Sequence, residues 1–482
     1  MIHEKFLTIM IRLGFLHTMN HFEFSDLKPG AHIHFIGIGG ISMSGLAQIL
    51  LQAGYRVTGS DRARTHITEK LEQLGAVIHY GHAAENVSGA DLVVHTAAVH
   101  DDNPEMIAAK TQHIRLIDRA ECLGAIMKRY KNAVGVAGTH GKTTTTSMLA
   151  HAMVHAGVDP TISIGGELDL IDGNIRTGSS DYFVTEACEY TNSFLKFFPS
   201  IALITNIEAD HLDFFSGLEE IIESFRKFAL LTKNGGHVVA WGGDANIRKA
   251  LDGTGLHILY YGIGPGFDYY SENCTYGNGF PAFDVMRAGA KLCHIQLNVP
   301  GEHNILNALA AIAVCDLLGI APSIAAAGIE TFHGTHRRFE KKGTFNGAAV
   351  IDDYAHHPTE IQATLKATQN LPHNKLWCVF QPHTYTRTKT LWNDFKTCFR
   401  LADELILTDI YAAREQFDGV TTAENLAADI CSAGINAVYM KTFAEIEAYL
   451  RARVQPGDVV FTMGAGDVFQ IGNHLLGIKK DA

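Results

Sequence analysis

The sequence is poor in proline and contains no closely spaced cysteine pair. Its 482 residues include 12 prolines, and its 8 cysteines stand apart at positions 122, 188, 274, 293, 315, 378, 398 and 431. So few prolines exclude a linker-rich or collagen-like chain. Scattered cysteines without a Cys-x-x-Cys motif exclude a small disulfide framework, so we expect reduced thiols and a cytoplasmic protein.

Long apolar runs and an excess of positive charge are also missing. No apolar stretch reaches the roughly 18 residues of a membrane span, so we expect no membrane insertion. Lysine and arginine number 39 against 51 acidic residues, and the formal net charge of -12 argues against a general nucleic-acid binder. We therefore expect small molecules as partners, and a monomer or a weak homodimer.

What is present indicates a globular protein with several cores. Hydrophobic residues make up 46% of the chain and charged residues 19%, and the length suggests roughly three domains. The 46 glycines fit many tight turns between strands and helices. The sequence from Met19 onward resembles a natural protein start, so we expect residues 1–18 to be a non-native or disordered extension.

Three segments of the chain each alternate short β-branched runs with helical patterns, which predicts parallel sheets covered by helices. We expect an α/β protein of three domains: a Rossmann-like domain at 19–130, a central P-loop ATPase-type domain at 131–333 and a Rossmann-like domain at 334–482. The aromatic, alternating stretch 260–299 predicts antiparallel hairpins at one edge of the central sheet. The predicted strands are 32–38, 56–60, 77–80, 91–96, 114–117, 133–137, 182–185, 201–205, 237–241, 348–352, 376–381, 404–408, 437–440 and 459–463.

A first glycine-rich turn, GIGGIS at 37–42, follows a predicted strand and opens a helix. Such turns place backbone amides and a helix N-terminus against a diphosphate. The candidate residues are Gly39, Gly40 and Ser42, with Asp61 and Thr96 at the ends of neighbouring strands. The third glycine of a dinucleotide fingerprint is replaced by Ser42, so a nicotinamide cofactor is a weaker alternative, and a tight turn without a ligand is another.

A second turn, GTHGKTT at 138–144, is the strongest single signal in the chain and indicates a nucleoside triphosphate. The predicted phosphate-binding residues are Gly138, Thr139, His140, Gly141, Lys142, Thr143 and Thr144. The loop amides suit a phosphate chain, the Lys142 ammonium suits the β- and γ-phosphates, and the Thr143 hydroxyl suits Mg²⁺. The strict pattern with a further glycine fails at Val136.

Candidate metal ligands follow two strands near that loop. Glu186 comes directly after the strand predicted at 182–185, and His211 follows the strand predicted at 201–205. Ligands of α/β sheets collect at the carboxyl ends of the strands, and Mg²⁺ prefers oxygen donors. We therefore expect Thr143 and Glu186 at the metal, with His211 at the metal or at the substrate.

The ordered motifs resemble the Mur ligase family, the ATP-dependent amino-acid-adding enzymes of peptidoglycan synthesis. The matching segments are GIGGISMSGLA (37–47), GTHGKTTT (138–145), EACEYTNSFL (186–195), TNIEADHLD (205–213), GEHNILNALAA (301–311), THRRFE (335–340), DDYAHHPTE (352–360) and QPHTYTRTKTL (381–391). Together they span the chain from about Leu27 to Gly477. The chain departs from the family pattern at Cys188 and Tyr190, where an acid and a serine are common.

The resemblance implies a UDP-sugar in the first domain, ATP in the central domain and an amino acid brought by the third. It implies ATP-dependent joining of L-alanine to the lactyl carboxylate of UDP-N-acetylmuramate through an acyl phosphate. His303, Asn304 and Asn307 match positions near the adenine, although Asn304 is equally suited to capping a helix. Arg338 matches an arginine that reaches the ATP phosphates, and Asp353 matches a position at the ribose or the lysine–phosphate network. The implied catalytic set is Lys142, Glu186, His211 and Arg338.

Two loops of the third domain are predicted to hold the amino acid. Tyr354 and His356 follow one strand, and His383 and Arg387 follow another, with Arg387 as the carboxylate clamp. The pair His356-His357 is a poor zinc site, because adjacent side chains of an extended segment point to opposite sides. Alternatives for the whole chain are a ligase that adds a murein tripeptide to the same acceptor, a folate polyglutamylating ligase, an NAD-linked oxidoreductase and a nucleotide-binding regulator.

Overall fold

The computed structural model describes residues 22–96, 98–233 and 235–478, so the extension predicted at 1–18 lies outside the described residues. Two compact units divide the chain. The first contains the described residues up to Ala133 together with Ile175–Thr177 and Lys196–Pro199, and the second contains the remainder. Within the described residues, no helix is long and apolar enough to cross a membrane.

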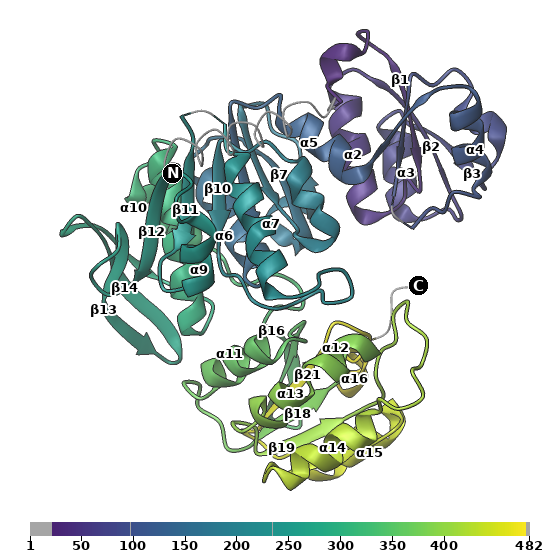
Figure 1. Ribbon diagram of the computed structural model, residues 1–482. Coiled ribbons are helices and arrows are strands. Elements are labelled where there is room, and N and C mark those ends of the chain that lie inside the picture. Colours follow the sequence, from purple (N-terminus) through teal and green to yellow (C-terminus); the bar gives the residue numbers. More distant parts are fainter. Residues whose placement is uncertain (1–21, 97, 234, 479–482) are drawn as a thin grey trace, which may run out of the picture. The chain divides into compact units, whose positions relative to one another are not determined.

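The first unit is built on a five-stranded parallel sheet in the order β3-β2-β1-β4-β5 (Figure 1). Its strands are β1 (His32–Ile36), β2 (Arg56–Asp61), β3 (Val77–Tyr80), β4 (Leu92–His95) and β5 (Arg115–Asp118). Its helices are α2 (Ile41–Gln52), α3 (His66–Gln73), α4 (Pro104–Thr111) and α5 (Arg119–Met127). The strand order reverses between β1 and β4, which makes a crevice at their carboxyl ends.

Side-chain caps mark where the helices of this unit begin. Thr65 accepts the amide of Thr68 at the start of α3, and Asp118 accepts the amide of Glu121 at the start of α5. These contacts satisfy amides that have no partner inside the helix. All five residues of β1 are buried, as expected for the central strand of a sheet with helices on both faces.

The second unit contains two sheets. The larger places strands side by side in the order β15-β14-β13-β12-β11-β10-β6-β9-β7. Its strands are β6 (Asn132–Ala137), β7 (Thr161–Leu168), β9 (Tyr182–Glu186), β10 (Ile201–Ile204), β11 (His237–Trp241), β12 (His257–Ile263), β13 (Tyr269–Gly277), β14 (Phe280–Arg287) and β15 (Ala290–Gln296), and the short β8 spans Gly173–Arg176. The hairpins β13–β14 and β14–β15 are antiparallel, which confirms the antiparallel edge predicted for 260–299.

Helices α6 (Lys142–His155), α9 (Glu302–Leu317) and α10 (Pro322–Ile329) pack against this sheet and against one another. Their apolar residues and those of the strands form one buried core. Two further helices of this unit, α7 (Leu218–Leu230) and α8 (Ala245–Leu251), pack against each other. Because β6 lies between β9 and β10, the loop that follows β6 emerges between the ends of two neighbouring strands.

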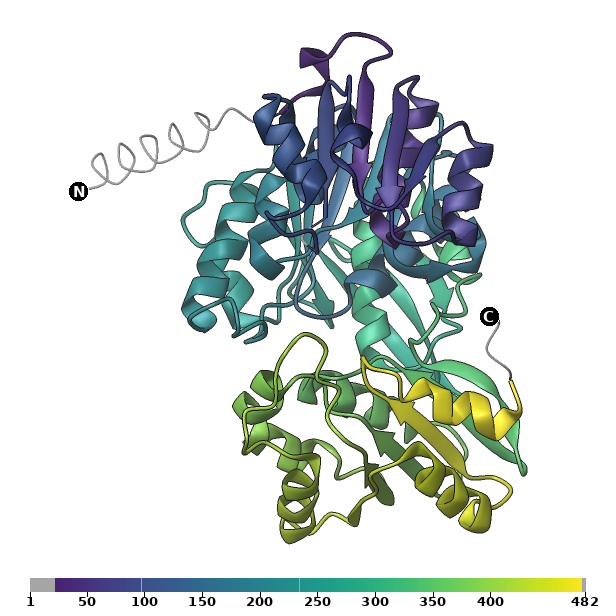
Figure 2. The ribbon, with the colours of Figure 1, turned by 90° about the vertical axis from the view of Figure 1, so that its right-hand side faces the viewer.

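The smaller sheet of this unit has the order β16-β17-β21-β18-β19-β20. Its strands are β16 (Glu340–Phe345), β17 (Ala348–Asp353), β18 (Leu376–Phe380), β19 (Glu404–Leu407), β20 (Ala437–Tyr439) and β21 (Val459–Met463). Its helices are α11 (Pro358–Thr368), α12 (Tyr385–Thr390), α13 (Trp392–Cys398), α14 (Ala423–Ser432), α15 (Phe443–Arg453) and α16 (Phe469–Leu476). Helices lie on both faces of the sheet (Figure 2), and they enclose two separate cores, one with α11, α13 and α14 and one with α15 and α16.

The observed architecture confirms the predicted α/β class, with two differences in the smaller sheet. The edge strand β16 is antiparallel to β17, so the sheet is not wholly parallel. The strands β17 and β18 are not direct neighbours, because β21 lies between them and pairs with both. The loop after β21 therefore stands between the two loops predicted to hold the amino acid.

Candidate functional site

The first glycine turn lies at the crevice of the parallel sheet in the first unit. The Gly39 amide donates to Asp61 Oδ2 at 2.8 Å, so the predicted acid braces the turn. A Cβ at Gly37, whose φ is +81°, would lie 3.0 Å from Thr96 Cγ2. The structure thus brings Gly39, Asp61 and Thr96 together, and Gly40 precedes the first residue of α2. Open amides at a helix N-terminus suit a diphosphate.

The second glycine turn joins β6 to α6 and is held in shape by residues that follow β10. The His140 amide donates to Asn206 Oδ1 at 2.8 Å, and Thr205 Oγ1 donates to the His140 carbonyl at 2.6 Å. Gly138 and Gly141 have φ values of +143° and +81°, which explains why glycine stands at both positions. The loop is therefore shaped by its tertiary neighbours before any ligand arrives.

The ammonium of Lys142 is held by its own loop and by a carboxylate that the sequence analysis did not single out. Its Nζ donates to the Gly138 carbonyl at 2.5 Å, to the Thr139 carbonyl at 3.2 Å and to Glu189 Oε2 at 3.0 Å. Glu189 is only 2% exposed. Burial alone would lower the Lys142 pKa, but Glu189 outweighs it and raises the pKa, so the ammonium stays charged. Glu189 lies between the two positions, Cys188 and Tyr190, where the chain departs from the family pattern.

The predicted metal ligands have defined places near this lysine. Glu186 ends β9, and its Oε1 accepts the Gly165 amide at 2.7 Å. His211 Nε2 lies 3.7 Å from Glu189 Oε1, and its ring packs on Tyr190 with 4.6 Å between the ring centroids. Thr143 is in the first turn of α6. Oxygen donors from Thr143 and Glu186 suit a hard cation such as Mg²⁺.

A cavity of about 240 Å³ gathers the residues predicted to hold the nucleotide. Aromatic side chains of Trp241, Tyr261 and Phe332 form walls that the sequence analysis did not identify. Such surfaces suit a flat base. The predicted residues that line the cavity are His140, Gly141, Thr144, His303, Asn304, Asn307, Arg338 and Asp353.

Asn304 and Asn307 are occupied by the protein itself. Asn307 Oδ1 accepts the Thr145 hydroxyl at 3.1 Å, and its Nδ2 donates to Asn304 Oδ1 at 3.0 Å. Asn304 Nδ2 donates to the Pro300 carbonyl at 2.7 Å, and Gly301 is the residue that caps α9, so the capping role considered for Asn304 is not observed. The two amides connect α9 to the phosphate loop.

Asp353, at the end of β17, is buried and accepts three hydrogen bonds. They come from the amides of Ala355 at 2.8 Å and Phe339 at 3.1 Å and from the Thr364 hydroxyl at 3.1 Å. Burial raises the Asp353 pKa to about 6 despite the nearby Arg338 guanidinium. Its side chain therefore ties the middle of α11 and the residue before β16 to the end of β17, and it also lines this first cavity.

A second cavity of about 270 Å³ brings the phosphate loop together with the loops of the smaller sheet. The predicted residues that line it are Thr139, His140, Gly141, Lys142, Thr143, Thr144, His211, Arg338, Tyr354, His356, His383 and Arg387. The glycine loop at 138–144 and the residues His383 and Arg387 thus line one cavity, although about 240 positions separate them in the sequence. The loop after β21 contributes Ala465.

Arg387 is paired with a buried carboxylate. Its Nε and Nη2 donate to Asp210 Oδ1 at 3.2 and 3.0 Å, and Asp210 is 9% exposed. Burial opposes ionisation of Asp210, but the Arg387 charge outweighs it and holds the Asp210 pKa well below its usual range. The pair joins the loop after β10 to α12, so Arg387 lies in a short helix and not in the loop predicted for it. If Arg387 binds the carboxylate of the amino acid, it does so while it is also paired with Asp210.

Two imidazoles beside this pair are neutral at pH 7. Burial, together with the Arg387 charge, lowers the pKa values of His356 and His383 to about 4. The two rings lie 5.8 Å apart, and Tyr354 packs edge-on against His356 at 5.5 Å. Neutral imidazoles are able to accept a proton or a hydrogen bond from an ammonium group.

Glu360, in the first turn of α11, connects the phosphate loop to the cations of the site. Its Oε1 lies 3.2 Å from His140 Nδ1 and 3.5 Å from Arg338 Nη1. Its Oε2 accepts the amides of His356 and His357 at 3.1 and 3.3 Å. Glu360 is the last residue of the motif DDYAHHPTE at 352–360, but no role was predicted for it, and its contacts with His140 and Arg338 depend on the fold.

The fold and the site define an α/β protein in which a glycine-rich loop between β6 and α6 lines two cavities, one with aromatic walls and one with cationic and imidazole side chains. The chain belongs to the Mur ligase family. Three family profiles match in order: Mur ligase family, catalytic domain, at residues 32–131; Mur ligase middle domain at 136–315; and Mur ligase, glutamate ligase domain, at 337–466.

Individual relatives support the family assignment over nearly the full chain. The chain is 51% identical to the UDP-N-acetylmuramate–L-alanine ligase of Caldanaerobacter subterraneus, over 94% of this chain and 99% of the relative. The crystal structure of a UDP-N-acetylmuramate–alanine ligase from Thermotoga maritima matches with a TM-score of 0.75 and 32% identity, over 92% of this chain and 98% of that one. A murein peptide ligase from Psychrobacter arcticus matches with a TM-score of 0.66 and 26% identity, over 94% and 99%.

Proposed function

We propose that this chain joins L-alanine to UDP-N-acetylmuramate with hydrolysis of ATP to ADP and phosphate. The observation that carries the proposal is the cavity in which the phosphate loop meets Arg338, Tyr354, His356 and Arg387. The 51% identical relatives named for this reaction support the choice of substrates. The product serves peptidoglycan synthesis, and hence cell shape and division, and we place the enzyme in the cytoplasm as a monomer or weak homodimer.

The reaction proceeds in two steps. The lactyl carboxylate attacks the γ-phosphorus of ATP, the bond to the bridging oxygen breaks, and ADP leaves from an acyl phosphate. The amine of L-alanine then attacks the acyl carbon, and the carbon–oxygen bond to phosphate breaks with its electron pair on the leaving phosphate. The proton lost by nitrogen passes to a base at the site.

The side chains have distinct proposed tasks in these steps. Lys142 and Arg338 stabilise the negative charge of the transferring phosphoryl group. Arg387 binds the carboxylate of L-alanine beside Asp210, and the neutral imidazoles of His356 and His383 face the same space. His211 positions the lactyl carboxylate or accepts the proton. Closing the site protects the acyl phosphate from water.

We propose Mg²⁺ as the metal cofactor, held by Thr143 and Glu186 with His211 nearby. The oxygen donors fit this cation, since Glu186 ends a strand next to the phosphate loop. When bound, Mg²⁺ supplies positive charge to the ATP phosphates.

We propose that each domain binds one substrate: residues 19–130 the UDP-sugar, 131–333 ATP and 334–482 the amino acid. The residues proposed to contact the UDP-sugar are Gly39, Gly40, Ser42, Asp61 and Thr96.

Phosphate release tests the proposal. The full chain, with ATP, Mg²⁺ and UDP-N-acetylmuramate, is assayed against a panel of amino acids and the murein tripeptide. We expect release that depends on all three substrates, with L-alanine preferred and glycine and L-serine poorer. A preference for the tripeptide would favour the peptide-ligase alternative, and release without an amino acid would exclude a ligase.

A further inference from the structure

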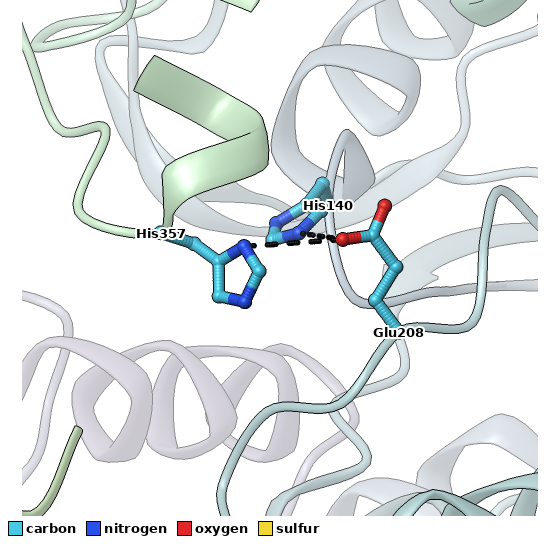
Figure 3. A group of neighbouring side chains, drawn as sticks. All are labelled: His140, Glu208 and His357. Atoms are coloured by element: carbon cyan, nitrogen blue, oxygen red, sulfur yellow. Dashed lines mark ion pairs between the residues drawn. The ribbon is translucent and has the colours of Figure 1, made fainter. Parts of the chain in front are cut away.

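A cluster of metal-ligating side chains lies at the phosphate loop, apart from the proposed Mg²⁺ ligands. His140, Glu208 and His357 each direct one donor atom to a common space, and the three atoms lie within 4.8 Å of one another (Figure 3). His140 Nε2 is 3.5 Å from Glu208 Oε2, and His357 Nδ1 is 3.9 Å from the same oxygen. One carboxylate oxygen thus faces two imidazoles. His357 Nδ1 also accepts the Thr359 amide at 3.4 Å, a long contact that a metal at this nitrogen would replace.

We propose that His140, Glu208 and His357 form a binding site for a zinc-type divalent cation. Ligands of tetrahedral zinc, at bond lengths of about 2.0–2.1 Å, lie about 3.4 Å from one another. The two measured nitrogen–oxygen separations exceed this value by only a few tenths of an ångström. Two imidazoles and one carboxylate favour zinc over magnesium, which prefers oxygen donors, and they leave the fourth position for water or a ligand.

The surroundings of the cluster supply the outer contacts that such sites need. Glu360 Oε1 lies 3.2 Å from His140 Nδ1, on the side of the ring opposite to the donor atom, as in carboxylate–histidine–zinc arrangements. The Thr359 hydroxyl donates to Glu208 Oε2 at 2.6 Å and orients the carboxylate. Within the described part of the chain, His140 Nε2 is buried and makes no hydrogen bond of normal geometry, and Glu208 Oε2 faces it at 3.5 Å as an ion-pair partner. A cation would satisfy that nitrogen.

The charges around His140 favour a cation at this place. Burial alone would lower the His140 pKa, but Glu360 and Glu208 raise it to about 9. His357 is already neutral, because burial and the His140 charge lower its pKa. The other charged groups facing the cluster are Arg338, at Glu360, and Asp210, near His357.

The site would connect two parts of the second unit. His140 belongs to the phosphate loop and Glu208 to the loop after β10, whereas His357 precedes the first residue of α11. His140 and Glu208 also line the nucleotide cavity. A bound cation would hold α11 against the phosphate loop and oppose nucleotide exchange, so zinc is expected to inhibit turnover even with Mg²⁺ in large excess.

Metal binding by the full-length, zinc-stripped protein tests the proposal independently of the reaction. Co²⁺ is titrated and followed by its visible absorption, which is intense for tetrahedral sites, and Zn²⁺ affinity is measured by competition with a chromogenic chelator. We expect one equivalent that binds more tightly than the rest and is displaced from Co²⁺ by Zn²⁺. The chain has 26 histidines, so only the variants below assign that equivalent to the cluster.

Three variants complete the test. His357→Asn keeps a capping side chain for α11 but removes the imidazole, and Glu208→Gln removes the charge but keeps an oxygen for the Thr359 hydroxyl of that helix. Each should weaken the tight equivalent at least tenfold, whereas His356→Gln, whose ring nitrogen contacts the Tyr354 carbonyl, should leave it unchanged. The proposal is overturned if the tight equivalent is absent or survives both cluster variants. Chelator-reversible inhibition by zinc is a separate readout that also requires the proposed ligase reaction.

Discussion

At the scale of single residues, the site depends on charges that are paired before substrate arrives. Lys142 is held by Glu189, Arg387 by Asp210, and His140 and Arg338 by Glu360. Each acid is at least largely buried, so removing its partner would leave a charge without solvent or counter-ion. Activity and stability are therefore linked at these positions.

Replacing Lys142 with alanine should abolish ATP-dependent phosphate release while the protein stays folded. Loss of a charge at a transferring phosphoryl group raises the barrier by about 3 kcal/mol or more, which is a rate loss of at least about a hundredfold. Single-turnover phosphate release measures the effect. Lys249→Ala, which removes an exposed ion pair with Glu219, serves as the control. Turnover within twofold of the parent would show that the loop is not the catalytic phosphate site.

Replacing Arg387 with alanine should raise the KM for L-alanine strongly and change the KM values for ATP and the UDP-sugar little. The reason is loss of the guanidinium that is proposed to bind the substrate carboxylate. The variant also leaves Asp210 buried without a cation, which costs about 3 kcal/mol or more of stability.

The double variant Arg387→Ala/Asp210→Asn separates these two effects of the Arg387 substitution. It should recover thermal stability without recovering the KM for L-alanine. An unchanged KM in a folded Arg387→Ala variant would mean that the Asp210 pair is purely structural.

Tyr354→Ala should admit larger amino acids, because the aromatic ring is proposed to set the upper size limit of the pocket. One methylene group changes selectivity by about 1–3 kcal/mol, and the ring is much larger than a methylene group.

At the scale of secondary-structure elements, one buried carboxylate joins α4 to the first sheet. Glu105 is fully buried and accepts the Ser60 hydroxyl at 2.6 Å and the Asn86 amide at 2.6 Å, with His82 Nδ1 at 2.8 Å and His34 Nε2 at 3.6 Å. Burial would raise its pKa, but these contacts together lower it to about 2. The helix is thus anchored by a charge.

The Glu105 pKa predicts how the stability of this unit depends on pH. A carboxyl whose pKa falls from 4.5 to about 2 on folding stabilises the native state above pH 4.5, and the contribution is lost as the pH falls toward 2. Glu105→Gln should therefore cost about 3 kcal/mol at pH 7, and the difference from the parent should shrink between pH 4.5 and 3. Urea unfolding at pH 7, 5, 4 and 3 measures it, with exposed Glu85→Gln as the control. A difference that does not change with pH would contradict the assignment.

Glu360, in the first turn of α11, should be needed for activity. Glu360→Gln keeps an oxygen for the amides of His356 and His357 but removes the charge that pairs with His140 and Arg338. We expect kcat/KM for ATP to fall at least tenfold, or about 1.4 kcal/mol, with an unchanged circular dichroism spectrum. Glu302→Gln, an exposed acid in the first turn of α9, should leave the rate within twofold.

At the scale of the whole molecule, the two glycine turns belong to different units and should respond to different ligands. UDP-N-acetylmuramate and ATP with Mg²⁺ should each raise the Tm. At a ligand concentration one hundred times the Kd, the free energy of unfolding should rise by about 2.7 kcal/mol. NAD should not raise the Tm, because the first turn is proposed to bind a UDP-sugar. Differential scanning calorimetry measures the shifts. Lys142→Ala should lose most of the ATP shift and keep the UDP-sugar shift, and a Tm increase with NAD would contradict the assignment.

Much of the fold follows from local patterns, with exceptions that have physical reasons. The strands predicted at 237–241 and 459–463 coincide with β11 and β21, because short buried runs between turns have few alternatives. The strand predicted at 77–80 coincides with β3, although that edge strand is partly exposed. The strands β7 and β16 were not predicted. The first contains two consecutive glycines, Gly165 and Gly166, and the second is a polar, partly exposed edge strand, so neither shows an apolar period.

The sequence by itself determined the family, the α/β class and the position of the phosphate loop, because strand periodicity and the backbone freedom of glycine are local properties. Which charges neutralise one another was decided only by the tertiary structure. Glu189, Asp210 and Glu360 are ordinary acids in the sequence, yet the order of the strands brings each of them to a cation 47, 177 and 220 positions away. The insertion of β21 between β17 and β18 likewise sets the spacing of the amino-acid loops. Such pairings depend on distances across the fold, which no local pattern encodes.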